Sequence, residues 1–218
     1  MTSPLAVILG VGPLIGLSVT RRFAREGFRT AMVGIDAALL EEQAPAIPGA
    51  RAFVSDLGEP GSVRDVFRRI REGLGEADVL VYHASAGARG SSSALDPETL
   101  RRDLRVNAIA PLEAVQEVLP AMRRAGQGTL LFTGGGLALK PQADMASASM
   151  GKAAIRQLAL CLAEELKPAG IHAATITIAG FVQRDTSFNP ELIAESYWQL
   201  HAEAREHWRS EVVLVPGS

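Results

Sequence analysis

Cysteine is nearly absent from the chain, since Cys161 is the single one among 218 residues. One cysteine excludes an internal disulfide and any metal site built from several thiolates, so a reducing, cytoplasmic setting is expected. Charge of one sign is not in excess either: 22 Lys and Arg face 24 Asp and Glu, giving a formal net charge of -2. This balance excludes the strongly basic surface that phosphate backbones require, and no nucleic-acid partner is predicted.

Long hydrophobic runs are also lacking. The apolar start of the chain, from Leu5 to Val19, is interrupted by three glycines and a proline. It is shorter than the roughly 20 residues that a membrane-spanning helix needs, and no basic region precedes it, as a secretory signal would require. The sequence therefore predicts neither a membrane span nor a targeting segment.

Apolar residues make up 47% of the chain, enough for one sizeable core, so residues 1–218 are expected to form a single domain. Short apolar runs alternate with longer amphipathic stretches. The runs predict strands at Leu5–Leu9, Thr30–Val33, Ala52–Val54, Val79–Tyr82, Thr129–Phe132, Ala173–Ile178 and Val212–Val215. The stretches predict helices at Ile15–Glu26, Ala37–Gln43, Ser62–Glu72, Pro97–Arg124, Ser147–Lys167 and Pro190–Arg209. This alternation is typical of an α/β fold: a Rossmann-like, doubly wound parallel sheet of about seven strands with helices on both faces.

Ligands of doubly wound sheets bind beyond the carboxyl ends of the strands. At the first such end stands a glycine-rich segment, Gly10-Val11-Gly12-Pro13-Leu14-Ile15-Gly16, which opens the next helix. Such a turn lets backbone N–H groups approach a pyrophosphate, and the helix N-terminus adds a favourable field. Two interpretations stay open: a nucleotide site, or a tight strand-to-helix turn without a ligand.

Several ordered motifs resemble the short-chain dehydrogenase/reductase family over nearly the whole chain. They are the glycine segment, Asp56 after the third strand, Val81-Tyr82-His83-Ala84-Ser85, Arg105-Val106-Asn107, Ser147-Ala148-Ser149-Met150-Gly151-Lys152, and Ala179-Gly180-Phe181-Val182 followed by Thr186. The resemblance implies an oxidoreductase that uses NAD or NADP on a small carbonyl or alcohol. It implies a homodimer or homotetramer, with the substrate segment at about 183–209. The cofactor residues that it implies are Gly10, Gly12, Pro13, Leu14, Ile15, Gly16, Asp36, Asp56, Leu57, Ala84, Asn107, Lys152, Gly180 and Val182.

The reacting hydroxyls of that family are missing here, although Lys152 and Asn107 occupy two of its catalytic positions. In this register Ala148 replaces the tyrosine four residues before the lysine, and Gly135 replaces the serine after the fifth strand. A shift of register does not recover the tyrosine, because neither of the chain's two tyrosines lies four residues before a lysine. Without these groups the charge that develops on the substrate oxygen lacks its usual partner, and acid–base groups typically contribute about 10²–10⁴-fold.

Substitute proton donors are few. His83 is a candidate, although a structural role is favoured for it and more strongly for Ser149 and Thr133. Tyr197 fits a core stripe with Ile193, Leu200, Ala204 and Trp208 on one helix. His201 and His207 are six residues apart on the same predicted helix, which does not suit a metal pair, and no metal site is predicted.

Two departures touch the cofactor. Leu14 replaces a family glycine next to the phosphates, so either its side chain turns away or the nucleotide shifts. Asp36 either replaces the acid that takes the ribose hydroxyls, which would disfavour NADP, or caps the next helix. The choice between NAD and NADP therefore stays open.

Two functions follow as hypotheses. The first is an NAD(P)-dependent oxidoreductase with a substituted donor, favoured by Lys152 and Asn107. The second is a nucleotide-binding or interaction module that has lost the reaction, favoured by Ala148, Gly135 and Leu14. A solvated surface charge is the competing interpretation of Lys152.

Overall fold

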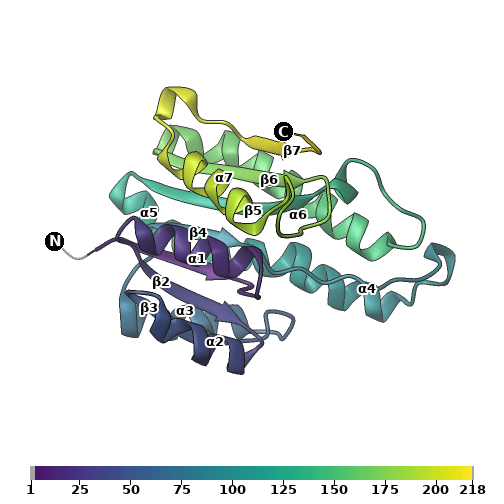
Figure 1. Cartoon of the computed structure of the whole chain (residues 1–218), viewed down its shortest axis with the longest axis horizontal. Helices are drawn as coiled ribbons and strands as arrows, with labels where there is room; N and C mark the ends of the chain where they lie inside the picture. Colours follow the sequence, from purple (N-terminus) through teal and green to yellow (C-terminus); the bar gives the residue numbers. More distant parts are fainter. Residues whose placement is uncertain (1–2, 218) are drawn as a thin grey trace.

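The computed structural model describes residues 3–217. Its core is one sheet of seven parallel strands in the order β3-β2-β1-β4-β5-β6-β7. The chain therefore starts in the middle of the sheet, builds one half outward to β3, and returns to build the other half to β7 (Figure 1). The strands are β1 (Leu5–Leu9), β2 (Arg29–Gly34), β3 (Ala50–Val54), β4 (Val79–Tyr82), β5 (Gly128–Gly135), β6 (Ile171–Ile178) and β7 (Glu211–Leu214).

Helices cover both faces of the sheet, which confirms the doubly wound α/β prediction. Side chains of α1, α2 and α7 pack on one face, and those of α3, α5 and α6 pack on the other. All five residues of β1 and all eight of β6 are buried, as expected for strands covered on both sides. The helices are α1 (Ile15–Arg25), α2 (Ala37–Gln43), α3 (Ser62–Leu74), α4 (Pro97–Leu104), α5 (Ala110–Ala125), α6 (Ala146–Leu166) and α7 (Pro190–Ala202).

The single helix predicted over Pro97–Arg124 is wrong, because a π-helical turn at Arg105–Ile109 separates α4 from α5. Asn107 lies in the middle of this turn and is buried. Its Nδ2 donates to the Ala86 carbonyl (2.7 Å) and its Oδ1 accepts from the Ala86 N–H (3.1 Å). Turns of this kind are frequent at functional sites, and here the turn ties α4 and α5 to the segment after β4.

The helix predicted over Pro190–Arg209 is also too long, because α7 ends at Ala202. Beyond it Trp208 stacks on His172 (ring centroids 4.7 Å apart), and its indole N–H donates to the Glu203 carbonyl. These contacts turn the chain away from the helix axis. The predicted core stripe therefore stops at Leu200 without Ala204 and Trp208, and His201 and His207 do not share a helix.

The fifth strand runs to Gly135, three residues past the predicted end at Phe132. Its last residues pair with β6, Thr133 opposite Ile176 and Gly135 opposite Ile178. A Cβ on Gly134 would lie 2.6 Å from the Thr177 hydroxyl oxygen, so this pairing needs a glycine there. As a result, Gly135 is the last residue of its strand, at the carboxyl edge of the sheet. Within residues 3–217, no helix is both long and apolar enough to cross a membrane.

Candidate nucleotide and active site

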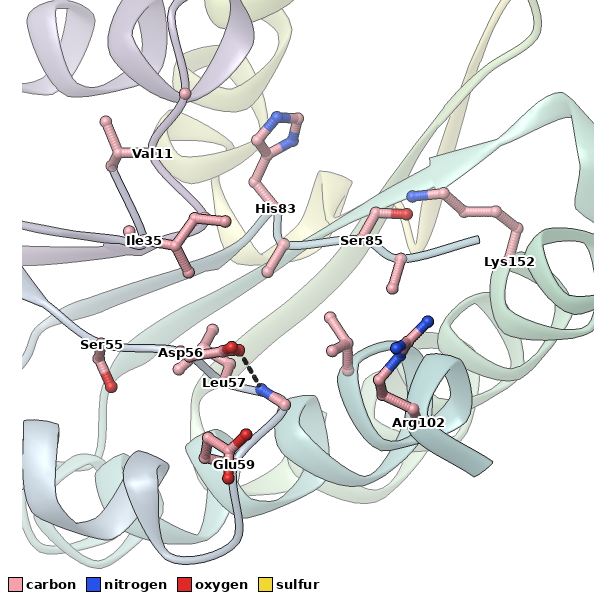
Figure 2. A pocket seen from close by; sticks show the side chains of 17 residues that line it. Val11, Ile35, Ser55, Asp56, Leu57, Glu59, His83, Ser85, Arg102 and Lys152 are labelled. Carbon is pink, nitrogen blue, oxygen red and sulfur yellow. Dashed lines mark hydrogen bonds between the residues drawn. The ribbon is translucent and has the colours of Figure 1, made fainter. Parts of the chain in front are cut away.

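A cavity of about 510 Å³ opens at the carboxyl edge of the sheet (Figure 2). It lies where the chain order of the sheet reverses, beside β1 and β4, which is where doubly wound folds bind ligands. Its walls come from the ends of the first four strands and from α4, the π-helical turn and α6. They are formed by Gly10, Val11, Gly12, Gly34, Ile35, Ser55, Asp56, Leu57, Gly58, Glu59, His83, Ala84, Ser85, Ala86, Arg102, Val106 and Lys152.

The glycine turn between β1 and α1 is held against the sheet. The N–H groups of Gly10 and Val11 both donate to the Val33 carbonyl at 2.8 Å. Gly10 has φ +95°, and a Cβ there would lie 2.2 Å from the Ala84 nitrogen. By contrast, nothing lies within 4 Å of a Cβ placed on Gly12, which faces the cavity. Gly10 thus serves the fold, whereas Gly12 keeps the cavity open.

The cavity brings together some of the predicted cofactor residues: Gly10, Gly12, Asp56, Leu57, Ala84 and Lys152. Asp56 accepts a hydrogen bond from the Gly58 N–H (2.8 Å), which shapes the loop after β3. The remaining predicted cofactor residues do not line this cavity; they are Pro13, Leu14, Ile15, Gly16, Asp36, Asn107, Gly180 and Val182.

The structure shows where three of the residues outside the cavity wall lie. Leu14 is 39% exposed and does not obstruct the cavity. Asp36 caps α2, because its Oδ1 accepts from the Leu39 N–H (3.0 Å). Gly180 packs against Phe188, whose ring atoms would lie 2.2 Å from a Cβ at that position.

Sequence reasoning missed several wall residues, and among these Arg102 is the one that brings a positive charge to the cavity. Arg102 and Val106 are four residues apart, so they lie one helical turn apart on one side of the helix. That spacing was the available signal. The Arg102 side chain makes no hydrogen bond or ion pair within residues 3–217 and is exposed at the cavity wall.

Lys152 of α6 reaches the carboxyl edge of β5. Its Nζ donates to the Thr133 carbonyl at 3.0 Å, and burial lowers the pKa of the Lys152 ammonium to about 8. A Cβ on Gly135 would lie 3.3 Å from the lysine Cγ and Cδ, so the lysine stem packs along Gly135. Lys152 is therefore a partly buried group held at the cavity rather than a solvated surface charge.

Ala148 is covered by the segment that follows β4. It is 8% exposed, and a Cβ on Gly87 would lie 2.7 Å from the Ala148 Cβ. The neighbouring Ser147 hydroxyl accepts from the Ala88 N–H (3.0 Å), which fixes this segment against α6. Gly87 thus lies against Ala148, and the Lys152 stem lies against Gly135, at the two positions where hydroxyls were expected by resemblance.

His83, at the end of β4, belongs to a buried chain of polar groups. Its Nδ1 lies 3.0 Å from the Thr133 hydroxyl, which in turn is hydrogen-bonded to the Tyr197 hydroxyl at 2.5 Å. Burial, together with the nearby charge of Lys152, lowers the pKa of His83 to about 4, so its ring is neutral at pH 7. Tyr197 is fully buried in the core, as its helical spacing predicts, and burial raises the pKa of its hydroxyl.

The other hydroxyls considered as donors are engaged elsewhere. Ser149 Oγ accepts from the Gln142 N–H (3.4 Å). Tyr82 donates its hydroxyl proton to the Val106 carbonyl at 2.5 Å. No three His, Cys, Asp or Glu side chains come close enough to hold a metal ion in the part of the chain that the structure describes.

The sequence matches a known protein family. Residues 4–193 match the family model described as short chain dehydrogenase. A short chain dehydrogenase/reductase of Cryptosporiopsis sp. is 27% identical over 189 residues, which cover 78% of this chain and 74% of the relative. The cyclic-di-GMP-binding biofilm dispersal mediator protein of Escherichia coli is 28% identical over 189 residues, covering 87% and 76%.

Solved structures show the same fold. A metagenomic short-chain oxidoreductase in complex with NADP superposes with a TM-score of 0.88 at 24% identity, over 100% of this chain and 99% of that one. An alcohol dehydrogenase from the archaeon Thermococcus sibiricus, complexed with 5-hydroxy-NADP, gives 0.87 at 20% identity over 98% and 96%.

Proposed function

We propose that this chain, which belongs to the short chain dehydrogenase family, is an oxidoreductase that uses NAD or NADP on a small carbonyl or alcohol through an altered active site. The observation that carries the proposal is the cavity of about 510 Å³, into which the glycine turn, Asp56 and Lys152 converge from separate elements. The bound dinucleotide would supply or accept the hydride.

The residues of the cavity fit such a dinucleotide. Gly12 presents no side chain, so phosphates can approach the backbone at the start of α1, where the helix field favours anions. Asp56, Leu57 and Lys152 line the cavity, and by the resemblance Asp56 and Leu57 would hold the adenine and Lys152 the nicotinamide ribose. Asn107, through its two hydrogen bonds to Ala86, positions the wall segment after β4 and does not itself line the cavity.

The named relatives support the cofactor class. Two structural neighbours are described as complexes with NADP or 5-hydroxy-NADP, and a sequence relative is named a short chain dehydrogenase/reductase. We infer the same class of cofactor for this chain. We further infer a homodimer or homotetramer, because large apolar side chains are exposed at Ile109, just before α5, at Leu112 of α5 and at Met150 of α6. Sedimentation velocity measures this association directly. We infer a cytoplasmic location from the single cysteine of the chain.

A second candidate function is nucleotide binding without turnover. It is favoured by Ala148 and Gly135, which carry no hydroxyl and lie against Gly87 and the Lys152 stem. It is also in keeping with the relative named for binding cyclic-di-GMP. In this case the cavity would serve as a sensor site.

A fluorescence titration of the purified chain with NADH and with NADPH tests the first step. We expect binding of at least one of them, displaced by AMP in excess, and then oxidation of the bound cofactor by members of a panel of small ketones and aldehydes. Binding without turnover, together with displacement by cyclic-di-GMP, would favour the second candidate. No binding of either dinucleotide at millimolar concentration would contradict the cofactor assignment.

A further inference from the structure

Three polar side chains from three elements form a continuous hydrogen-bonded chain beside the cavity. His83 follows β4, Thr133 lies in β5 and Tyr197 lies in α7, 64 residues away from Thr133. His83 belongs to the cavity wall, whereas Tyr197 is fully buried on the far side of Thr133. The chain therefore links the cavity to the core.

The donors and acceptors along this chain favour one tautomer of His83. The Tyr197 hydroxyl has no partner other than Thr133 within residues 3–217, so it satisfies its buried proton by donating to the Thr133 oxygen. Thr133 then has its own proton left for His83, whose Nδ1 must accept it. A neutral imidazole that accepts at Nδ1 carries its proton on Nε2.

The Nε2–H of His83 is the free end of this chain. No hydrogen bond to this atom is formed among the described residues, and the atom is not one of the buried side-chain atoms without a partner. His83 also shares the cavity wall with Lys152 (Figure 2). A donor of one tautomer, held from behind by two buried hydroxyls, is thus left without a protein partner on a residue that lines the cavity.

We propose that His83 is the ligand-contacting hydrogen-bond donor of this site, and that its Nε2–H binds the substrate carbonyl oxygen in place of the hydroxyls absent at Ala148 and Gly135. The proposal rests on the proposed oxidoreductase function. Donors aimed at an oxygen on which negative charge develops are among the largest contributors to catalysis, and a neutral imidazole serves in this role.

His83 keeps its proton in this role. Loss of the Nε2 proton would leave an imidazolate. Transfer of the Thr133 proton to Nδ1, and of the Tyr197 proton to Thr133, would make the ring neutral again but would leave Tyr197 as a buried phenolate, which the raised pKa of Tyr197 opposes. The Thr133 and Tyr197 hydroxyls are therefore positioning groups that fix the tautomer of His83. They do not relay a proton, and the alkoxide oxygen that hydride transfer leaves on the substrate takes its proton from solvent water that enters the open cavity.

Nitrogen-15 labelling of the chain's four histidines tests the tautomer without any turnover. We expect one histidine, identified by its loss in His83→Gln, to show the Nε2–H tautomer from pH 5.5 to 8. We then add NADH, followed by isobutyramide, whose carbonyl is not reduced. The His83 Nε2 signal is expected to shift when the amide is added, while the exposed-loop control His207→Gln leaves the shift unchanged.

Thr133→Val and Thr133→Ser separate the hydroxyl from its volume. The valine variant is expected to mix the two tautomers of His83 and to weaken isobutyramide binding at least tenfold, whereas the serine variant restores both. NADH affinity is expected to stay within about twofold in both, because Lys152 bonds the backbone carbonyl of residue 133. An Nδ1–H tautomer, or a His83 signal that ignores the amide while NADH binds, would overturn this assignment alone. Failure of both dinucleotides to bind would overturn the proposed function together with it.

Discussion

The two halves of the cavity differ in how closely their residues follow the pattern of the short chain dehydrogenase family. In the half beside β1, β2 and β3, the positions that must lack a side chain are glycines: Gly10 at φ +95° and Gly34, whose Cβ would lie 2.7 Å from the Val11 carbonyl oxygen. Next to the other half, which is formed by the end of β4, α4 and α6, Ala148 and Gly135 occupy the positions where the resemblance implies hydroxyls, and neither residue lines the cavity.

This difference separates binding from reaction. In the proposed function, nucleotide binding depends on backbone shape, which the glycine turn provides, whereas reaction depends on individual polar groups, and Ala148 and Gly135 provide no hydroxyl. Lys152 belongs to the reaction half yet remains at the cavity with a lowered pKa, and His83 presents a donor beside it. We therefore propose that an amine and an imidazole serve this half of the cavity in place of the hydroxyls.

The largest expected effect comes from Gly10→Ala. The methyl group would meet the Ala84 backbone at 2.2 Å in a left-handed conformation, so we expect a loss of more than about 3 kcal/mol in the free energy of unfolding. Urea unfolding followed by circular dichroism measures it.

Gly12→Ala is the matched control for Gly10→Ala. A Cβ there has open space, so the fold should lose less than about 1 kcal/mol, while the methyl group enters the cavity and weakens NADH binding. Equal destabilisation by the two variants would contradict the division between a glycine that serves the fold and one that serves the cavity.

Much of this architecture could be predicted from the sequence. Every strand was found within three residues of its ends, because a strand covered on both faces is an uninterrupted apolar run. The glycine turn was found because the strand before it and the helix after it give the motif its context. Both signals are local, and local signals survive in a single sequence.

The remainder depends on contacts between distant residues. The π-helical turn arises where Asn107 bonds Ala86, and α7 ends where Trp208 stacks on His172, which no helical periodicity reveals. His83 and Tyr197 could be named as candidates, but the chain through Thr133 needs the sheet to be assembled first. Arg102 lies one helical turn before Val106, a spacing that puts both on one side of the helix, but only the assembled fold shows that this side faces the cavity.

Restoring the tyrosine is expected to harm the protein. In Ala148→Tyr the ring must displace the segment at Gly87, which already lies close to the Ala148 Cβ, so we expect a loss of about 1–3 kcal/mol in stability. Ala153→Tyr, on the exposed face of the same helix, should change stability by less than about 0.5 kcal/mol. A stable Ala148→Tyr variant with raised ketone reduction would show that there is space for the tyrosine ring beside Gly87.

Lys152→Met is expected to weaken NADH binding at least tenfold and AMP binding less than twofold, because we infer that the amine contacts the nicotinamide ribose. The charge of Lys152 is present below pH 8 and is lost as the pH rises through 8. NADH affinity should therefore fall between pH 7 and 9 in the unmodified chain and stay flat in the variant. Equal losses for NADH and AMP would remove the ribose assignment.

Lys152 also links stability to pH. Its pKa in the folded chain, about 8, is below its usual 10.5, so between these values the unfolded chain holds more protons and stability rises with pH. Thermal unfolding at pH 7.5 and 9.5 should show this rise in the unmodified chain and a smaller one in Lys152→Met. The same rise in both would place the titration elsewhere.

The smallest expected effect is the preference between NADH and NADPH. At the end of β2 the cavity wall is Ile35, 74% exposed, while the Asp36 carboxylate is engaged with the Leu39 N–H. Neither a carboxylate for the ribose hydroxyls nor a cation for a 2′-phosphate is thus contributed here, and we expect the two dissociation constants to agree within about tenfold, or 1.4 kcal/mol.

Ile35→Arg should shift this preference toward NADPH by at least about tenfold, because a guanidinium binds a phosphate in bidentate fashion. Asp36→Asn removes a charge beside the same position while an asparagine still caps α2, so it isolates the electrostatic part of the effect and should shift the preference less than Ile35→Arg does. A hundredfold preference in the unmodified chain would mean that a group from beyond the β2 edge, with Arg102 the first to replace by alanine, reaches the 2′ position. A residue of α4 would then determine the choice between NADH and NADPH, and cofactor binding would depend on the wall that the two halves of the cavity share.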